Sequence, residues 1–174
     1  MERTLPLRET QEPLKAGYRA NPEQALFTLR ARASSDDDNP VSCSVDIGRA
    51  LYEAQAHAGV GGAGTAACSG DLLLGALAAC AQITCQMVAA SNNLEVRAAA
   101  VTVEGDLDLR GTLGVAKEAP VGFTAIRMTF DIDAPALTEG QRRSLATLTE
   151  RYCTVMQALQ HPPQIDTRWT ASDS

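Results

Sequence analysis

The longest apolar stretch of the chain runs from Leu72 to Ala90, and it predicts the element around which the fold is arranged. It contains no charged residue, no proline and one glycine, and its apolar positions fall on every face of a helix. Because a surface helix carries a polar stripe, the pattern predicts a buried central helix. Ser69 is the expected N-cap, and Asp71 lies in the first turn, where the helix dipole favours negative charge.

A membrane-spanning interpretation of this stretch is less favoured. Its length of about 19 residues would suffice to cross a bilayer. Gln82 and Gln86 interrupt it, however, no cluster of Lys or Arg flanks it, and alanine is too weakly apolar to drive insertion. We expect the core helix of a soluble domain, with no membrane partner.

Alternating apolar and polar positions before this helix predict two strands. Residues 25–33 alternate, residues 34–40 have the Asx and proline chemistry of a turn, and residues 41–47 alternate again. The pair is expected to form a hairpin with a longer loop. The polar, proline-containing residues 1–22 are expected to form an N-terminal arm.

Two further alternating segments follow the central helix. Residues 96–109 form the first, and residues 126–132 form the second and give the strongest strand signal of the chain. Turns are predicted at residues 110–114 and 117–122 between them.

A capping box formed by Thr138 and Gln141 predicts the start of a second helix. Pro162 and Pro163 end it, and residues 165–170 are expected to form a last short strand. The apolar stripe of this helix, with two further residues on the same side, comprises Leu145, Leu148, Thr149, Tyr152, Cys153, Met156 and Leu159.

The resulting order is β-β-α-β-β-α-β, which predicts an α+β fold with antiparallel or mixed sheets around the central helix. The length of 174 residues fits one domain, residues 1–174.

Charge and cysteine usage exclude several function classes. The net charge of −6, from 15 Lys and Arg against 21 Asp and Glu, argues against nucleic acid or an anionic membrane as the main partner. Five cysteines without a C-x-x-C pair suggest neither a disulfide framework nor a zinc site, and we predict no metal and no cofactor. With no apolar run behind a basic start, we expect a cytoplasmic protein with free thiols.

The glycine-rich segment from His57 to Gly64 lacks the G-K-[ST] ending of a phosphate loop. A flexible connection is the favoured interpretation, and a substrate mouth is the alternative. His57 has no second histidine-rich element to support a metal.

Cysteine positions carry the main chemical signal. Cys80 and Cys153 each lie midway along an inward-facing stripe, where neighbouring helices could bring the sulfurs to disulfide distance. Free cysteine is also among the residues most often simply buried. Cys85 cannot pair with Cys80, because five residues on a helix separate them by about 140° and about 7.5 Å along the axis. Cys43 and Cys85 are interpreted as packing residues, and Cys68 as a more exposed third thiol.

Three motifs, in order, resemble the OsmC/Ohr family. D-L-L-L-G-A-L-A-A-C, from Asp71 to Cys80, is similar to that family's central-helix signature. V-x-V-E-G-D-L-D, residues 101–108, is similar to its following strand. Y-C-T-V-M-Q-A-L, residues 152–159, resembles its second-cysteine motif. The resemblance extends over residues 25–170.

This resemblance implies an intertwined homodimer with active sites at the subunit interface. The family's enzymes reduce organic hydroperoxides with two cysteines, an arginine and a glutamate. Cys80 would be the peroxidatic thiolate and Cys153 the resolving thiol, with a dithiol as reductant. The candidate arginines are Arg49 and Arg32, and Asp71 stands where the family's acidic residue opens the helix.

The chain departs from the family pattern at two motifs. S-G-D, residues 69–71, replaces the usual N-P-E, and Thr154 replaces the proline after the second cysteine.

Two functions from different classes follow. The first is a thiol peroxidase for hydrophobic organic hydroperoxides, an antioxidant activity of the stress response. The alternative is a protein that binds a small apolar ligand or senses thiol redox state at the same pocket, without turnover.

Overall fold

The computed structural model describes residues 32–36, 39–46, 51–114 and 116–170, and a few earlier positions (11, 15–17, 20, 21 and 26). Before Glu53, strand residues are described by their backbone alone. The predicted N-terminal arm therefore lies mostly outside the described residues, as does most of the predicted first strand.

The central helix is confirmed as α2 (Ser69–Ser91), but its N-cap is Cys68 and not Ser69. The Cys68 sulfur accepts the backbone N–H of Asp71 at 3.4 Å, and the Asp71 carboxylate accepts the backbone N–H of Cys68 at 2.9 Å. Serine is the commoner cap, but only a cap at residue 68 lets Asp71, three residues on, complete a capping box.

The prediction that α2 is buried all round is wrong for the single chain. Its covered face contains Leu77, Ala81, Thr84, Cys85, Val88 and Ala89. On the open face Ile83 is 55% exposed, and Met87 and Leu73 are exposed as well. The helix is also long and apolar enough to cross a membrane, a test that the core helices of soluble proteins pass too. Its packing against a sheet and two helices is that of a core helix.

A long antiparallel hairpin covers one side of α2. Strands β4 (Ala98–Leu107) and β5 (Phe123–Asp133) confirm the two predicted strands after the helix, and they pair from Ala98↔Asp133 to Leu107↔Phe123. Alternate residues face α2, so the apolar set, such as Val101, Val103 and Phe130, packs on the helix. The opposite face is polar and exposed, and there Arg127 pairs with Asp106 (2.8 Å) and Glu104 (3.7 Å).

A second antiparallel sheet has the order β1-β2-β3, made of β1 (Arg32–Asp36), β2 (Asn39–Asp46) and β3 (Leu51–Gln55). The predicted hairpin exists, but the predicted turn over residues 34–40 is wrong, since both strands extend into it. The Asx and proline residues there favour a turn locally, but pairing of the two backbones extends the strands to Asp36 and from Asn39. Strand β3 was missed, and its Gln55 bridges in parallel to Cys68, next to the start of α2.

The glycine-rich segment is an ordered loop. It contains the short helix η2 (Ala58–Val60), whose N-cap His57 accepts the N–H of Gly59 at 3.0 Å through Nδ1. A Cβ at Gly62 would overlap the carbonyl oxygen of Ala56, so this position requires glycine. The predicted turn over residues 110–114 is largely the short helix α3 (Leu109–Thr112).

The predicted second helix is two helices. Helix α4 (Glu139–Tyr152) begins with the expected capping box of Thr138 and Gln141, and α5 (Thr154–Gln160) follows after a break at Cys153. Tyr152, the last residue of α4, is exposed, although the stripe placed it inside. Leu159 is exposed too, whereas Leu145 and Met156 are buried as expected.

The predicted last strand over residues 165–170 does not form in this chain. Ile165 and Trp169 are 82% and 95% exposed. An alternating segment forms a strand only when a pairing edge is available to it.

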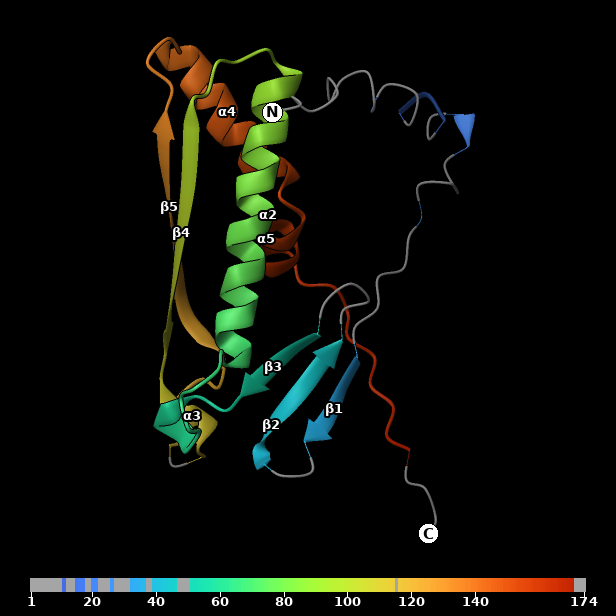
Figure 1. The fold of residues 1–174 in the computed structure, drawn as a ribbon, viewed down its shortest axis with the longest axis vertical. Coiled ribbons are helices and arrows are strands. Elements are labelled where there is room, and N and C mark those ends of the chain that lie inside the picture. Colours follow the sequence, from blue (N-terminus) through green and yellow to red (C-terminus); the bar gives the residue numbers. More distant parts are fainter. Residues whose placement is uncertain are drawn as a thin grey trace.

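Figure 1 shows the arrangement: the β4–β5 hairpin runs along α2, α4 and α5 lie on another side of the helix, and the β1–β3 sheet lies near its N-terminal end. Two apolar clusters result. One surrounds Cys85, Val88 and Leu145; the other surrounds Leu77, Cys153 and Met156 and includes Cys80 at its edge.

Candidate functional site

The site is centred on Cys80, in the middle of α2, where the helix packs against the break between α4 and α5. Burial raises the pKa of the Cys80 thiol. Hydrogen-bond interactions lower it by more than burial raises it. In decreasing order they come from the backbone N–H of Val155, the side chains of Cys153 and Thr84, and the backbone N–H of Thr154. The pKa of Cys80 is thus below its ordinary value, which favours the nucleophilic thiolate.

Cys153 lies at the break itself and is fully buried. Burial raises its pKa most; the N–H groups of Met156 and Val155 lower it, whereas its hydrogen bond with Cys80 and the Cys80 charge raise it further. The pKa shifts of the two thiols therefore have opposite directions, downward for Cys80 and upward for Cys153.

The break explains why α5 offers its N–H groups to a sulfur. Cys153 has extended backbone angles and is the N-cap of α5, but its side chain makes no capping hydrogen bond. The first N–H groups of a helix have no partner within the helix. Those of Val155 and Thr154 act on the neighbouring Cys80 thiol and lower its pKa. The chain remains anchored on both sides, since the Cys153 N–H donates to Thr149 O (3.0 Å) and its carbonyl accepts from Gln157 N (2.9 Å).

An open pocket of about 800 Å³ leads to Cys80. Most of its lining surface is apolar, and Thr84 places a hydroxyl group beside the sulfur. Lys15 is the charged side chain that lines it in the part of the chain that the structure describes. The full lining comprises Gln11, Lys15, Cys80, Ile83, Thr84, Met87, Val88, Ser91, Asn92, Leu148, Tyr152 and Thr154.

Asp71 is not brought to this pocket. It lies nine residues before Cys80, about 13 Å along the helix axis. Its carboxylate is engaged by Cys68: the backbone N–H of Cys68, then its side chain, and more weakly the His57 charge lower the pKa of Asp71. Its catalytic role stays a prediction.

The two candidate arginines cannot be placed at the sulfur. Arg49 lies outside the described residues, and Arg32 is described only by its backbone, as the first residue of β1.

Thr84 is a site residue that the sequence interpretation missed. It lies one helical turn after Cys80, so its hydroxyl reaches the same face of α2. The spacing alone could have suggested it. The N–H groups of Thr154 and Val155 could not have been found, because they depend on the break at Cys153.

The remaining described cysteines lie elsewhere. Cys85 is buried in the other apolar cluster, where burial raises the pKa of its thiol and a weaker interaction with Thr149 lowers it. This confirms Cys85 as a packing residue, and Cys68 serves as the helix cap. Among the described residues, no three His, Cys, Asp or Glu side chains gather in a way that could hold a metal ion.

The three motifs and this geometry can be compared with known proteins. A family model described as OsmC-like protein matches residues 62–168, more than half of the chain. The chain belongs to the OsmC-like protein family. The resemblance predicted from residues 71–80, 101–108 and 152–159 is confirmed. No curated protein matches the sequence.

Solved structures show the same fold. The chain is similar to an OsmC-like protein of Mycoplasma pneumoniae, with 17% identity, a TM-score of 0.63, and 78% of this chain and 89% of the other covered. It is also similar to an organic hydroperoxide resistance protein of Elizabethkingia anophelis with thiocyanate bound. The identity is 19%, the TM-score is 0.61, and the match covers 79% of this chain and 91% of the other. A third similar structure is an organic hydroperoxide resistance protein of Vibrio cholerae with captopril in one of its active sites. Its identity is 20%, its TM-score is 0.53, and the match covers 79% of this chain and 88% of the other. The expected α+β OsmC-like fold, with antiparallel sheet packed on a long central helix, is therefore confirmed.

Proposed function

We propose that this protein is a thiol peroxidase that reduces organic hydroperoxides through Cys80 and Cys153. The observation that carries the proposal is the opposite effect of one site on two adjacent thiols. Cys80 is accessible from the pocket and has a lowered pKa, whereas Cys153 is fully buried and has a raised pKa. A two-cysteine cycle needs this division between a nucleophile and a thiol held in reserve.

In the first step the Cys80 thiolate attacks the terminal oxygen of R–O–O–H. The S–O bond forms, the O–O bond breaks, and the alkoxide takes a proton from solvent water and leaves as the alcohol ROH. Sulfur is oxidised by two electrons to the sulfenic acid. The N–H groups of Thr154 and Val155, with the Thr84 hydroxyl, stabilise the thiolate before attack.

In the second step the Cys153 sulfur attacks the Cys80 sulfenic acid. The Cys153 proton and the hydroxyl of the sulfenic acid leave as water, and a disulfide forms. A dithiol reductant returns both residues to thiols by thiol–disulfide exchange. Because Cys153 is buried beside Cys80, it is positioned for Cys80 and shielded from the peroxide itself.

The pocket supports an organic hydroperoxide over hydrogen peroxide. Ile83, Met87, Leu148 and Tyr152 offer apolar surface to an alkyl or aryl group, and about 800 Å³ is within the range of small-molecule sites. Relatives of the same fold are described as organic hydroperoxide resistance proteins, and one holds captopril in an active site.

A homodimer is part of this proposal. The open face of α2, with Ile83 and Met87, borders the Cys80 pocket, so a second copy covering that face would also close the pocket. Arg49 or Arg32 is proposed to bring a guanidinium to the peroxide and the thiolate. Asp71 is the proposed acidic residue, in the first turn of α2, the helix that carries Cys80.

Counting free thiols before and after one equivalent of cumene hydroperoxide tests the function. Rapid loss of two thiols per chain, with regeneration by a dithiol and formation of cumyl alcohol, supports the peroxidase. Unchanged thiols with saturable binding of the peroxide would instead favour the ligand-binding alternative. Loss of thiols without alcohol turnover would favour the sensor.

A further inference from the structure

The two sulfurs of the proposed Cys80–Cys153 disulfide differ in how they can be reached from solution. Cys80 lines the open pocket on α2, whereas Cys153 is 0% exposed and does not line that pocket. Leu77, Ala81 and Met156 form the buried apolar cluster around Cys153. A molecule that enters the pocket therefore meets the Cys80 sulfur and not that of Cys153.

The main chain holds Cys153 in its buried position from both sides. Its N–H donates to the carbonyl of Thr149, and its own carbonyl accepts from the N–H of Gln157. Cys153 also ends α4 and precedes the first residue of α5, so moving its sulfur to the surface would disturb both helices. Its burial is thus fixed by the main chain and not by the thiol group.

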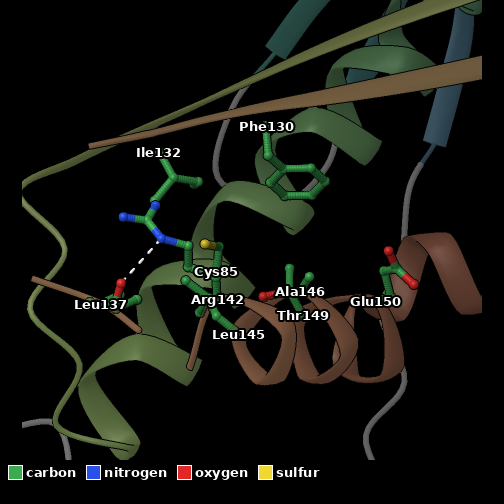
Figure 2. Close-up of a pocket in the computed structure, with 9 residues that line it drawn as sticks. All are labelled: Cys85, Phe130, Ile132, Leu137, Arg142, Leu145, Ala146, Thr149 and Glu150. Atoms are coloured by element: carbon green, nitrogen blue, oxygen red, sulfur yellow. Dashed lines mark hydrogen bonds between the residues drawn. The ribbon is translucent and has the colours of Figure 1, made fainter. Parts of the chain in front are cut away.

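A third thiol close to this region is kept apart from the pair. Cys85 lines a different cavity, of about 310 Å³, between α2, α4 and β5 (Figure 2). That cavity shares no lining residue with the Cys80 pocket. Burial raises the pKa of Cys85, which disfavours the thiolate form that attacks disulfides. Opening of the Cys80–Cys153 bond therefore depends on an external thiol.

We propose that the reducing thiol enters the Cys80 pocket and attacks the disulfide at the Cys80 sulfur, so that the mixed disulfide forms on Cys80 and not on Cys153. The inference rests on the proposed two-cysteine cycle. Leaving-group chemistry alone favours attack at Cys153, because a thiol of lower pKa leaves faster and the pKa shift of Cys80 is downward. Access decides the opposite way, since a nucleophile must touch the sulfur that it attacks and Cys153 has no exposed surface.

The regeneration then balances in two steps. A thiolate of the dithiol reductant bonds to the Cys80 sulfur, the Cys80–Cys153 bond breaks, and Cys153 leaves with the electron pair and takes a proton from water. Burial raises the pKa of Cys153, but the backbone N–H groups of Met156 and Val155 act in the opposite direction and stabilise the leaving thiolate.

In the second step the other thiol of the reductant loses its proton to water and attacks the reductant's own sulfur in the mixed disulfide. The disulfide of the reductant forms, and Cys80 leaves as the thiolate. The lowered pKa of Cys80 makes it a good leaving group in this step. Attack at Cys80 thus places the mixed disulfide where the second thiol can reach it.

Trapping the mixed disulfide with a monothiol tests the inference. The full chain is oxidised with diamide, which forms the Cys80–Cys153 bond without a hydroperoxide. N-acetylcysteamine, a slender monothiol, is added, the exchange is stopped with acid, and peptic peptides are mapped by mass spectrometry. The adduct on Cys80 should exceed that on Cys153 by about tenfold or more, because only Cys80 can be reached. In guanidinium chloride, where burial is lost, the two adducts should be comparable.

Two variants test the route of entry. Tyr152→Ala removes a side chain from the pocket wall, so it should speed the Cys80 reaction with glutathione, a bulkier thiol, more than that with N-acetylcysteamine. Trp169→Ala removes an exposed aromatic side chain that does not line the pocket, and it should change neither rate.

The inference is wrong if the native protein gives mainly a Cys153 adduct, or if diamide forms no Cys80–Cys153 bond. It is also wrong if Tyr152→Ala leaves the glutathione rate unchanged, since the thiol would then not enter through this pocket. A Cys80 adduct after diamide, in a protein whose thiols resist cumene hydroperoxide, would contradict the peroxidase and still support attack at Cys80.

Discussion

Cys80 and Cys153 are neighbours whose side-chain interaction shifts the two pKa values in opposite directions: it lowers the pKa of Cys80 and raises that of Cys153. The direction is fixed by the main chain around them. The break at Cys153 gives Cys80 two backbone N–H groups, whereas the Cys153 side chain lies in a fully buried position. The proposed roles of Cys80 as nucleophile and Cys153 as reserve thiol depend on this difference in pKa and burial.

Cys80→Ser should reduce turnover of cumene hydroperoxide to the uncatalysed rate, because a serine hydroxyl is neither ionised at neutral pH nor oxidised by a peroxide. The circular dichroism spectrum should stay that of the wild type, since the two side chains have nearly the same size. Cys68→Ser is the matched control: it lies in the same helix at its cap, where serine is a good substitute, and should keep activity. Wild-type turnover in Cys80→Ser would contradict the mechanism.

Peptide mapping under non-reducing conditions, after one equivalent of hydroperoxide, should find a Cys80–Cys153 disulfide as the main product. The reason is that the two side chains already interact, whereas Cys85 lies in the other apolar cluster. In Cys153→Ser, oxidation should stop at the Cys80 sulfenic acid, detected with a dimedone adduct. A dominant Cys68–Cys80 cross-link would reassign the resolving role to Cys68.

The rate of Cys80 alkylation by iodoacetamide should rise with pH around a midpoint below that of an ordinary thiol. A lowered pKa means that the thiolate persists to lower pH, and only the thiolate reacts. Removal of one stabilising group, in Cys153→Ala or Thr84→Val, should shift the midpoint upward. Quantification of the Cys80 peptide by mass spectrometry separates it from the other cysteines. A midpoint at or above the ordinary thiol value in the wild-type protein would refute the assignment.

The protein should be a dimer at micromolar concentration in light scattering, because α2 leaves an apolar face uncovered in one chain. Ile83→Glu, which puts a charge on that face, should raise the dissociation constant of the dimer at least tenfold. Peroxidase activity should fall with it. Leu113→Glu adds the same charge at a residue that is equally exposed, in the turn after α3, and should change neither. A monomeric wild-type protein would remove the interfacial site.

Two glycine substitutions should have opposite effects on the free energy of unfolding. Gly62→Ala should destabilise the protein by more than about 1 kcal/mol, because the new Cβ overlaps the main chain at Ala56 and neither backbone can move aside without a shift of the loop. Gly140→Ala, in the first turn of α4 with open space around it, should be neutral or stabilising by up to about 1 kcal/mol. Urea denaturation measures both. Equal effects would show that the loop after β3 adapts freely.

The elements with strong periodicity could be predicted from the sequence. The apolar run of α2, the alternation of β4 and β5, and the capping box of α4 depend on neighbours in the chain, and they were found within a few residues of their bounds. The two site cysteines could be chosen as well, through the motifs of residues 71–80 and 152–159. The family model confirms the resemblance on which that choice depended.

Other features depend on contacts that the order of residues does not reveal. Strand β3 has too little alternation to be seen alone, and it exists because β2 offers an edge for pairing. The segment 165–170 forms no strand, because no strand among the described residues pairs with it.

The chemistry of the site was decided by tertiary structure. The sequence could place Cys153 on a helical stripe, but it could not show that the helix breaks there and directs the N–H groups of Thr154 and Val155 to the sulfur of Cys80. The periodic pattern of apolar residues runs on from α4 to α5, because the two helices are separated by Cys153 alone. A break of one residue therefore leaves no mark on the spacing of apolar positions. The sequence thus determined which thiols meet. The fold determined the direction in which each pKa is shifted, because the pKa of a thiol depends on burial and on hydrogen-bond donors from distant parts of the chain.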